Sequence, residues 1–249
     1  MNFMVLVFSY PLWLSSSKSD ADRVSLQFYN GCFDNFSAHL FCDLLDGSLV
    51  EPDLVQADDV VIIGDSHALV FAELLRRSSV TSKFAGKHRF LFSGISSCLP
   101  SFDYVHELKE RRSTCHQLAV SVRDRSFRLV IAAKWNKYSH QMDVESDVLC
   151  ISQAPLFSLA PSAVPDVRSR WLRIALSDYL VQSRSIPDGC SVFNPYLDAF
   201  CSGSFCSQFD AQSQRFYYSD ANHLSNFGIE RALTIFDFSL FITLLGLGS

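Results

Sequence analysis

The chain has 249 residues, of which 48% are hydrophobic and 19% are charged, so it is globular and close to the largest size that one hydrophobic core supports. Its formal charge is −5, and its basic residues are scattered in short pairs, which argues against nucleic acid as a partner. We expect one domain over residues 58–249, preceded by an N-terminal lead-in over residues 1–57.

The lead-in begins with an apolar run over residues 3–14 that is interrupted by Pro11. This run is shorter than a membrane span, and no basic segment precedes it. Three interpretations stay open: a poor signal peptide, the remaining end of a transmembrane helix, or a strand. The rest of the lead-in is rich in Ser and Asp and shows weak periodicity.

Five apolar segments of the following domain have the length and composition of buried strands. They cover residues 60–63, 89–92, 127–133, 148–152 and 191–193. Helical spacing is predicted over residues 68–77, 106–123 and 168–182, and again after Ser225, which we expect to cap a helix. This alternation predicts an α/β fold with three α/β/α layers around a mostly parallel, five-stranded sheet. The apolar run over residues 236–247 is predicted to be a core helix or strand.

The turn after the first strand reads Gly64-Asp65-Ser66 and leads into a helix. Free amides at a helix N-terminus stabilise negative charge, so a Ser66 oxygen nucleophile would have support there for an oxyanion. Because the carboxyl ends of parallel strands meet at one edge, we expect Ser66, Gly94 and Asn136 to lie near one another. The alternative interpretation is that Ser66 only caps the helix.

A second motif near the C-terminus places Asp220 three residues before His223. An acid at this spacing can accept the imidazole Nδ1–H and leave Nε2 free to take a proton from serine. Asp103 and His106 have the same spacing, so His106 stays a second candidate for the base. His67 directly follows Ser66 and is interpreted as a neighbour of the site. The simpler alternative makes Asp220 a turn residue in a surface loop.

The eight cysteines include no Cys-x-x-Cys pair and no Cys/His cluster with zinc spacing, so we expect no metal site. Cys150 lies in an apolar run and is interpreted as a small buried hydrophobe. Cys98, Cys115, Cys201 and Cys206 lie in polar, turn-rich sequence, which favours disulfides and an oxidising compartment. Their pairing stays open at this point.

Taken in chain order, these motifs resemble the SGNH (GDSL-like) hydrolase superfamily. More narrowly, they resemble the SGNH domain of bacterial membrane acyltransferase-3 proteins, which O-acetylate surface polysaccharides. The motifs are Gly64-Asp65-Ser66-His67-Ala68, Ser97-Cys98-Leu99-Pro100, Cys115 ahead of a strand ending Ala133-Lys134-Trp135, Cys201 with Cys206, and Tyr218-x-Asp220-x-x-His223-Leu224-Ser225-x-x-Gly228.

The resemblance implies a flavodoxin-like fold and a catalytic triad of Ser66, His223 and Asp220, with chain position favouring His223 over His106. It also implies an oxyanion hole formed by the amides of Ser66 and Gly94 and the side chain of Asn136. In the superfamily the last of these belongs to Gly-x-Asn-Asp. Here that motif reads Lys134-Trp135-Asn136-Lys137, so the Asn is kept and its flanks are lost.

The implied activity is acyl transfer on a cell-surface polysaccharide, as an O-acetyl esterase or an O-acetyltransferase, through an acyl-enzyme without metal or cofactor. The implied location is extracytoplasmic in a bacterium, with a membrane acyltransferase-3 protein as candidate acyl donor. The implied disulfides are Cys98–Cys115 and Cys201–Cys206. The alternative is a catalytically inactive carbohydrate-binding or interaction module with the same fold.

Overall fold

The structure is a computed structural model. It describes residues 26–29, 31–33, 40–95, 115, 117–118, 120–122, 127–135, 148–157, 173–183, 186, 189–220 and 222–247.

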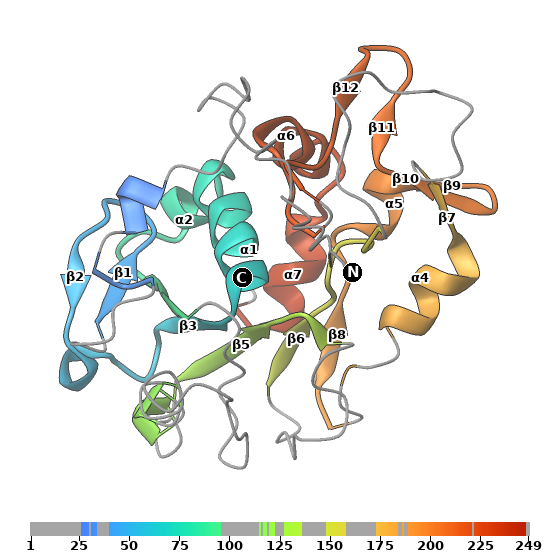
Figure 1. The fold of residues 1–249 in the computed structure, drawn as a ribbon. Coiled ribbons are helices and arrows are strands. Elements are labelled where there is room, and N and C mark those ends of the chain that lie inside the picture. Colours follow the sequence, from blue (N-terminus) through green and yellow to red (C-terminus); the bar gives the residue numbers. More distant parts are fainter. Residues whose placement is uncertain are drawn as a thin grey trace, which may run out of the picture.

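The centre of the molecule is a seven-stranded sheet with the order β2-β1-β4-β3-β5-β6-β8 (Figure 1). Five neighbouring strands run parallel: β3 (Val60–Gly64), β4 (Phe90–Gly94), β5 (Arg128–Ala132), β6 (Leu149–Ile151) and β8 (Ser191–Phe193). Counted along the chain, they lie in the order 2-1-3-4-5, which is the order of flavodoxin-like folds. The five predicted strands and the predicted fold class are confirmed.

Two further strands, β1 (Phe41–Asp43) and β2 (Leu49–Val50), extend the sheet antiparallel beyond β4. Both strands lie within the expected lead-in of residues 1–57. This part of the lead-in therefore pairs with the central sheet. Their few residues gave no strand pattern in the sequence. The apolar run over residues 3–14 lies outside the described residues.

Both faces of the sheet are covered, because successive side chains of a strand point to opposite faces. Val60 and Ile62 of β3 lie in one hydrophobic cluster, whereas Val61 and Ile63 lie in another. The first cluster includes Phe71 and other buried side chains of α1 (Ser66–Arg77) and Phe241 of α7 (Phe238–Leu244). The second includes Leu118 and Val122, two residues of the predicted helix over 106–123. This arrangement gives three layers.

The other helical segments surround this core or connect its strands. They are η2 (Leu26–Tyr29), η3 (Pro52–Leu54), α2 (Val80–Lys83), α4 (Leu176–Ser183), α5 (Leu197–Phe200) and α6 (Asn226–Leu233). Figure 1 shows α1, α6 and α7 on the same face of the sheet. As predicted, Ser225 caps α6, and its Oγ accepts from the Gly228 amide at 3.1 Å. Within the described part of the chain, no helix has the length and hydropathy needed to cross a membrane.

Two small sheets lie beside the main one. The first contains β7 (Arg173–Ala175), β9 (Cys201–Ser202) and β10 (Phe205–Ser207), and the second contains β11 (Phe209–Asp210) and β12 (Arg215–Phe216). The prediction of helix from residue 168 to 182 was therefore wrong at 173–175. These residues pair antiparallel with β10, and tertiary pairing overrides their local helical spacing.

Three disulfides are described: Cys32–Cys42, Cys150–Cys190 and Cys201–Cys206. Cys201–Cys206 is the pair that the resemblance implied. The interpretation of Cys150 as a free buried hydrophobe was wrong, because its sulfur is bonded to Cys190 across 40 positions of sequence. Cys115 is also disulfide-bonded. Cys98 lies outside the described residues, so the Cys98–Cys115 pairing stays a prediction.

Candidate active site

The turn from β3 into α1 places Ser66 as the first residue of the helix. The N-cap is Asp65, whose Oδ1 accepts the His67 amide at 2.8 Å. The structure therefore assigns the cap to Asp65 rather than to Ser66. A capping carboxylate satisfies one of the free amides at the start of the helix. The Ser66 hydroxyl is left to make other contacts, and its residue is only partly buried.

Gly64 is required at this turn for two reasons. Its φ of +149° lies where side chains are rarely accommodated, and a Cβ atom there would lie 1.8 Å from the Ala132 carbonyl oxygen. Strand β5 therefore approaches β3 closely where the two strands end. This contact brings the chain after β5 beside Ser66.

The Asp220–His223 segment is a tight loop held by its own backbone. Tyr218 and Leu224 form an isolated antiparallel bridge, and the Ser219 amide donates to the His223 carbonyl at 2.9 Å. Within the loop, Asp220 Oδ1 accepts the backbone amides of Asn222 at 2.7 Å and His223 at 2.9 Å. The Asp-x-x-His spacing is thus a local turn that orients the carboxylate toward the histidine ring.

Gly228 brings this loop close to α6. A Cβ atom at Gly228 would lie 2.0 Å from the Tyr217 carbonyl oxygen, so only glycine permits the approach. The Ser225 amide donates to that same carbonyl at 2.9 Å, and Ser225 Oγ donates to Phe216 at 2.9 Å. The end of the motif, Ser225-x-x-Gly228, therefore fixes the loop on the helix that follows it.

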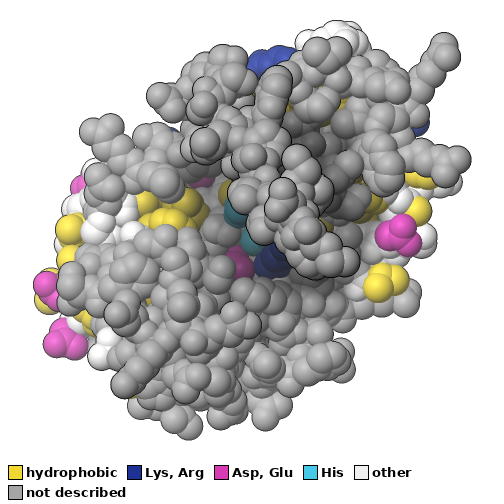
Figure 2. Space-filling view, in the orientation of Figure 1, with side chains coloured by type: hydrophobic (Ala, Val, Ile, Leu, Met, Phe, Trp, Pro, Cys, Tyr) yellow, Lys and Arg dark blue, Asp and Glu magenta, His cyan; other side chains and the backbone are white. Residues whose placement is uncertain are grey.

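Three predicted site residues meet at the carboxyl edge of the sheet. Nε2 of His223 lies 2.8 Å from Ser66 Oγ, and its Nδ1 lies 2.8 Å from Asp220 Oδ2 and 3.0 Å from Oδ1. The His223 and Asp220 side chains are 33% and 49% exposed, so solutes can reach them. Figure 2 shows histidine, acidic and basic side chains beside one another near the centre of this view.

The carboxylate of this trio is held ionised. Partial burial acts to raise the pKa of Asp220. Hydrogen bonds from the His223 ring and from the Asn222 and His223 amides outweigh it, so the pKa lies well below its ordinary value. An ionised carboxylate on Nδ1 keeps the proton there and leaves Nε2 as the acceptor that faces Ser66.

A second histidine packs against the first. The ring centroids of His67 and His223 are 5.4 Å apart, and His67 is buried. Burial, with smaller contributions from His223 and Lys134, lowers the pKa of His67 to about 3. His67 is therefore neutral near pH 7 and adds no charge beside the trio.

The predicted oxyanion-hole donors differ in their placement. The Ser66 amide lies at the N-terminus of α1, where the helix dipole favours an anion. The Gly94 amide donates to the Cys32 carbonyl at 3.0 Å, so it is already engaged. Asn136, like the alternative pair Asp103 and His106, lies outside the described residues. The roles of Gly94 and Asn136 stay predictions.

The sequence interpretation missed a link between the two motifs. Asp65 Oδ2 accepts the Lys134 amide at 3.0 Å, and Lys134 Nζ donates to Asn222 Oδ1 at 3.1 Å. The sequence motifs include Lys134 at a strand end and as a flank of Asn136, and neither position predicts these contacts. Its position directly beyond the third parallel strand, at the edge that carries Ser66, indicates only that it lies near the site.

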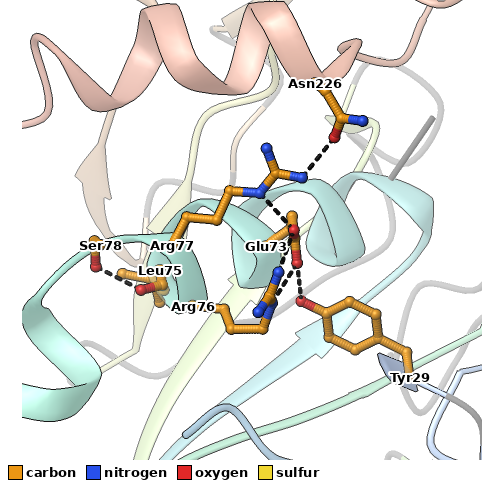
Figure 3. Close-up of polar contacts among 7 residues, drawn as sticks. All are labelled: Tyr29, Glu73, Leu75, Arg76, Arg77, Ser78 and Asn226. Carbon is orange, nitrogen blue, oxygen red and sulfur yellow. Dashed lines mark hydrogen bonds and ion pairs between the residues drawn. The ribbon is translucent and has the colours of Figure 1, made fainter. Parts of the chain in front are cut away.

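A buried ionic cluster fixes α1 in the fold (Figure 3). Glu73 accepts from Arg76 and Arg77 at 2.6–2.7 Å and from the Tyr29 hydroxyl at 2.9 Å. Arg77 also donates to Asn226 Oδ1 on α6 at 2.5 Å. Burial alone would raise the pKa of Glu73, but these donors outweigh it and lower the pKa. The cluster therefore joins α1, the helix that begins at Ser66, to η2 and to α6, the helix after the His223 loop.

No group of His, Cys, Asp and Glu suited to a metal ion occurs among the described residues. The described chemistry is that of a hydroxyl, an imidazole and a carboxylate in a hydrogen-bonded row, with a helix N-terminus beside the hydroxyl. This arrangement can deprotonate the hydroxyl and stabilise an anion formed next to it.

No family model matches the chain, and no curated protein sequence matches it. Among solved structures, it is similar to the periplasmic domain of a lipopolysaccharide acetyltransferase from Salmonella ser. Paratyphi A. The two share 14% of residues, and the similarity covers 72% of this chain and 81% of that chain with a TM-score of 0.49. A likeness of this size does not establish a common activity.

Proposed function

We propose that this protein catalyses acyl transfer from an ester, with Ser66 as nucleophile, His223 as general base and Asp220 as the carboxylate that orients and stabilises the imidazole. The observation that carries the proposal is the unbroken row from Ser66 Oγ through His223 to Asp220, with both contacts to the ring at 2.8 Å. A nucleophile bonded to a base that is oriented by a third group is the arrangement typical of serine acyl transfer.

The first half-reaction forms an acyl-enzyme. Ser66 Oγ attacks the ester carbonyl carbon, and its proton moves to His223 Nε2. The tetrahedral intermediate then loses the alkoxy group, which takes that proton and leaves as an alcohol. The ionised Asp220 stabilises the imidazolium that forms between these two steps.

The second half-reaction uses the same groups in reverse. A water molecule or a sugar hydroxyl attacks the Ser66 ester, giving up its proton to His223, and the proton returns to Ser66 Oγ as the acyl group leaves. Water makes the protein an esterase, and a sugar hydroxyl makes it an O-acyltransferase. In both half-reactions the Ser66 amide at the start of α1 supports the oxyanion.

We infer the substrate class from the motif resemblance: an O-acetylated carbohydrate or an acceptor carbohydrate of the bacterial cell surface. The three described disulfides support an oxidising compartment outside the cytoplasm. A membrane acyltransferase-3 protein as acyl donor is part of the same proposal. No metal or organic cofactor enters the mechanism.

The test is hydrolysis of p-nitrophenyl acetate together with labelling by a fluorophosphonate probe. Ser66→Ala should lower turnover on the order of 10³-fold or more and abolish labelling, since the proposed acyl-enzyme forms on Ser66 Oγ. Ser204→Ala, an exposed serine in the turn before β10, is the matched control and should keep wild-type activity.

Equal turnover by wild type and Ser66→Ala, with no label on Ser66, would refute the proposal. That result would instead favour the inactive carbohydrate-binding or interaction module. Release of acetate from an acetylated glycan, compared with acetyl transfer to a glycan acceptor, separates the esterase from the transferase.

A further inference from the structure

We propose that Lys134 is a positioning residue. It holds the loop that carries His223 in place relative to the turn that carries Ser66. This inference rests on the proposed function, because it concerns the geometry of that reaction. Lys134 lies just past the end of β5, beside the turn that carries Ser66. It contacts the nucleophile turn through its backbone and the Asp220–His223 loop through its side chain.

The backbone contact fixes the nucleophile side. The Lys134 amide donates to Asp65 Oδ2 at 3.0 Å, while Asp65 Oδ1 accepts the His67 amide at 2.8 Å. The Asp65 carboxylate is buried and so joins the end of β5 to the first turn of α1. In the chain, Ser66 lies between Asp65 and His67, whose amide this carboxylate accepts.

The side-chain contact fixes the base side. Lys134 Nζ donates to Asn222 Oδ1 at 3.1 Å, and the Asn222 amide donates to Asp220 Oδ1 at 2.7 Å. Asn222 immediately precedes His223, so a hydrogen bond to its side chain restrains the loop next to the histidine. Lys134 is thus connected to both ends of the Ser66–His223 contact.

The need for such a link follows from the chain topology. Ser66 and His223 are 157 positions apart, and the loop carrying His223 is also held by bonds within itself and to the segment around α6, and by packing of the His223 ring on His67. Without the Lys134 side chain, the loop can shift relative to the nucleophile turn. A misplacement of about 1 Å can cost roughly 100-fold in rate, because proton transfer needs a hydrogen-bonded pair.

The experiment compares Lys134→Met, Asn222→Leu and the double variant. Each is reacted with a fluorophosphonate, which Ser66 Oγ attacks at phosphorus while fluoride leaves and His223 takes the serine proton. We expect each single variant to lower the maximal inactivation rate by roughly 10- to 100-fold, with little change in the probe concentration at half-maximal rate. Turnover of p-nitrophenyl acetate should fall in kcat by a similar factor.

The double variant is the decisive arm. Because both side chains serve one contact, it should be no slower than the slower single variant. Lys134→Arg keeps a donor for Asn222 and should recover most of the rate. Lys87→Met, an exposed lysine before β4, removes the same charge away from the site and should behave like wild type.

Multiplicative losses in the double variant, or wild-type rates in either single variant, would overturn the inference. Circular dichroism and thermal unfolding monitor folding. If Lys134→Met does not fold, Asn222→Leu and its kcat decide the question by themselves. If wild-type Ser66 takes no label, the proposed function fails, which is a separate result from a failure of the Lys134 inference.

Discussion

The His67 side chain is a buried imidazole beside the proposed base, and its burial has a measurable consequence for stability. Its pKa is lowered to about 3 in the folded protein. In the unfolded chain an imidazole titrates near 6.5, as in model peptides. Between these values the unfolded state binds the proton and the folded state does not, so the stability provided by the neutral ring is lost as the pH falls from 6.5 toward 3.

We therefore expect acidification from pH 7 to pH 5 to lower the free energy of unfolding by about 2 kcal/mol through His67 alone. His67→Gln, which has no titrating ring, should lose that part of the pH dependence. The measurement is urea unfolding of both proteins at pH 5, 6 and 7. The same pH slope in the variant would show that His67 is not the group responsible.

At the level of single residues, the sequence best predicts functional residues that lie in motifs only a few positions long. Ser66, Asp220 and His223 could be named because each lies in a motif of a few residues, and the structure brings their side chains together. Lys134 and the contact between Cys32 and Gly94 could not be named. Their partners are distant in sequence, and only the fold makes them neighbours.

At the level of elements, α1 carries the proposed nucleophile Ser66 at its N-terminus and is anchored by the Glu73 cluster in its C-terminal half (Figure 3). Tyr29 of η2 reaches this cluster from the N-terminal segment. Burial, and to a smaller extent the charge of Glu73, raises the pKa of Tyr29. Its hydroxyl therefore stays protonated and donates to the ionised Glu73. Docking of η2 on α1 is therefore secured by a hydrogen bond to a charged group.

Tyr29 and Tyr218 are both buried, but only Tyr29 has a described hydroxyl hydrogen bond, so their Phe variants should differ in stability. Tyr29→Phe should lower the free energy of unfolding by about 1–3 kcal/mol, because Glu73 loses a donor while it stays buried. Tyr218→Phe should be neutral or stabilising, since the buried Tyr218 hydroxyl has no hydrogen-bond partner in the described part of the chain. Chemical denaturation measures both values, and equal costs would contradict the assignment.

Element types were predicted well where burial gives a strong pattern. Strands β3, β4 and β6 are fully buried and β5 is buried over its last three residues, as expected for strands covered on both faces, whereas the edge strand β8 leaves Ser191 and Val192 exposed. Strand β7 was missed because its three residues follow the spacing of the adjacent α4 and become a strand only by pairing with β10. Strands β1 and β2 are too short to show alternation, and they are specified by their neighbours.

At the level of the whole molecule, disulfides connect segments that are distant in sequence and neighbours in the fold. Cys32–Cys42 joins the N-terminal segment to β1, and Cys150–Cys190 links β6 to the chain just before β8. The sequence could indicate disulfides in general from cysteine number and context. It could not supply the partners, because pairing depends on which strands become neighbours.

Loop length predicts how much two of these bonds contribute. Replacing Cys150 and Cys190 by Ala should cost about 4 kcal/mol, and replacing Cys201 and Cys206 about 2 kcal/mol, because the cross-links span 40 and 5 positions. Urea unfolding without reductant measures both double variants. A larger loss for the Cys201–Cys206 pair would reverse the expected order and show that chain entropy is not the main contribution.

The unequal distances along the chain within the proposed triad also bear on how the protein is made. Asp220 and His223 belong to one turn, three positions apart, whereas Ser66 is 157 positions before His223. During synthesis the turn with the proposed nucleophile leaves the ribosome well before the proposed base has been made. If His223 is the base, as proposed, Ser66 stays unactivated in a nascent chain until the segment with His223 has docked beside α1, so Ser66 reactivity should report the docking of that segment.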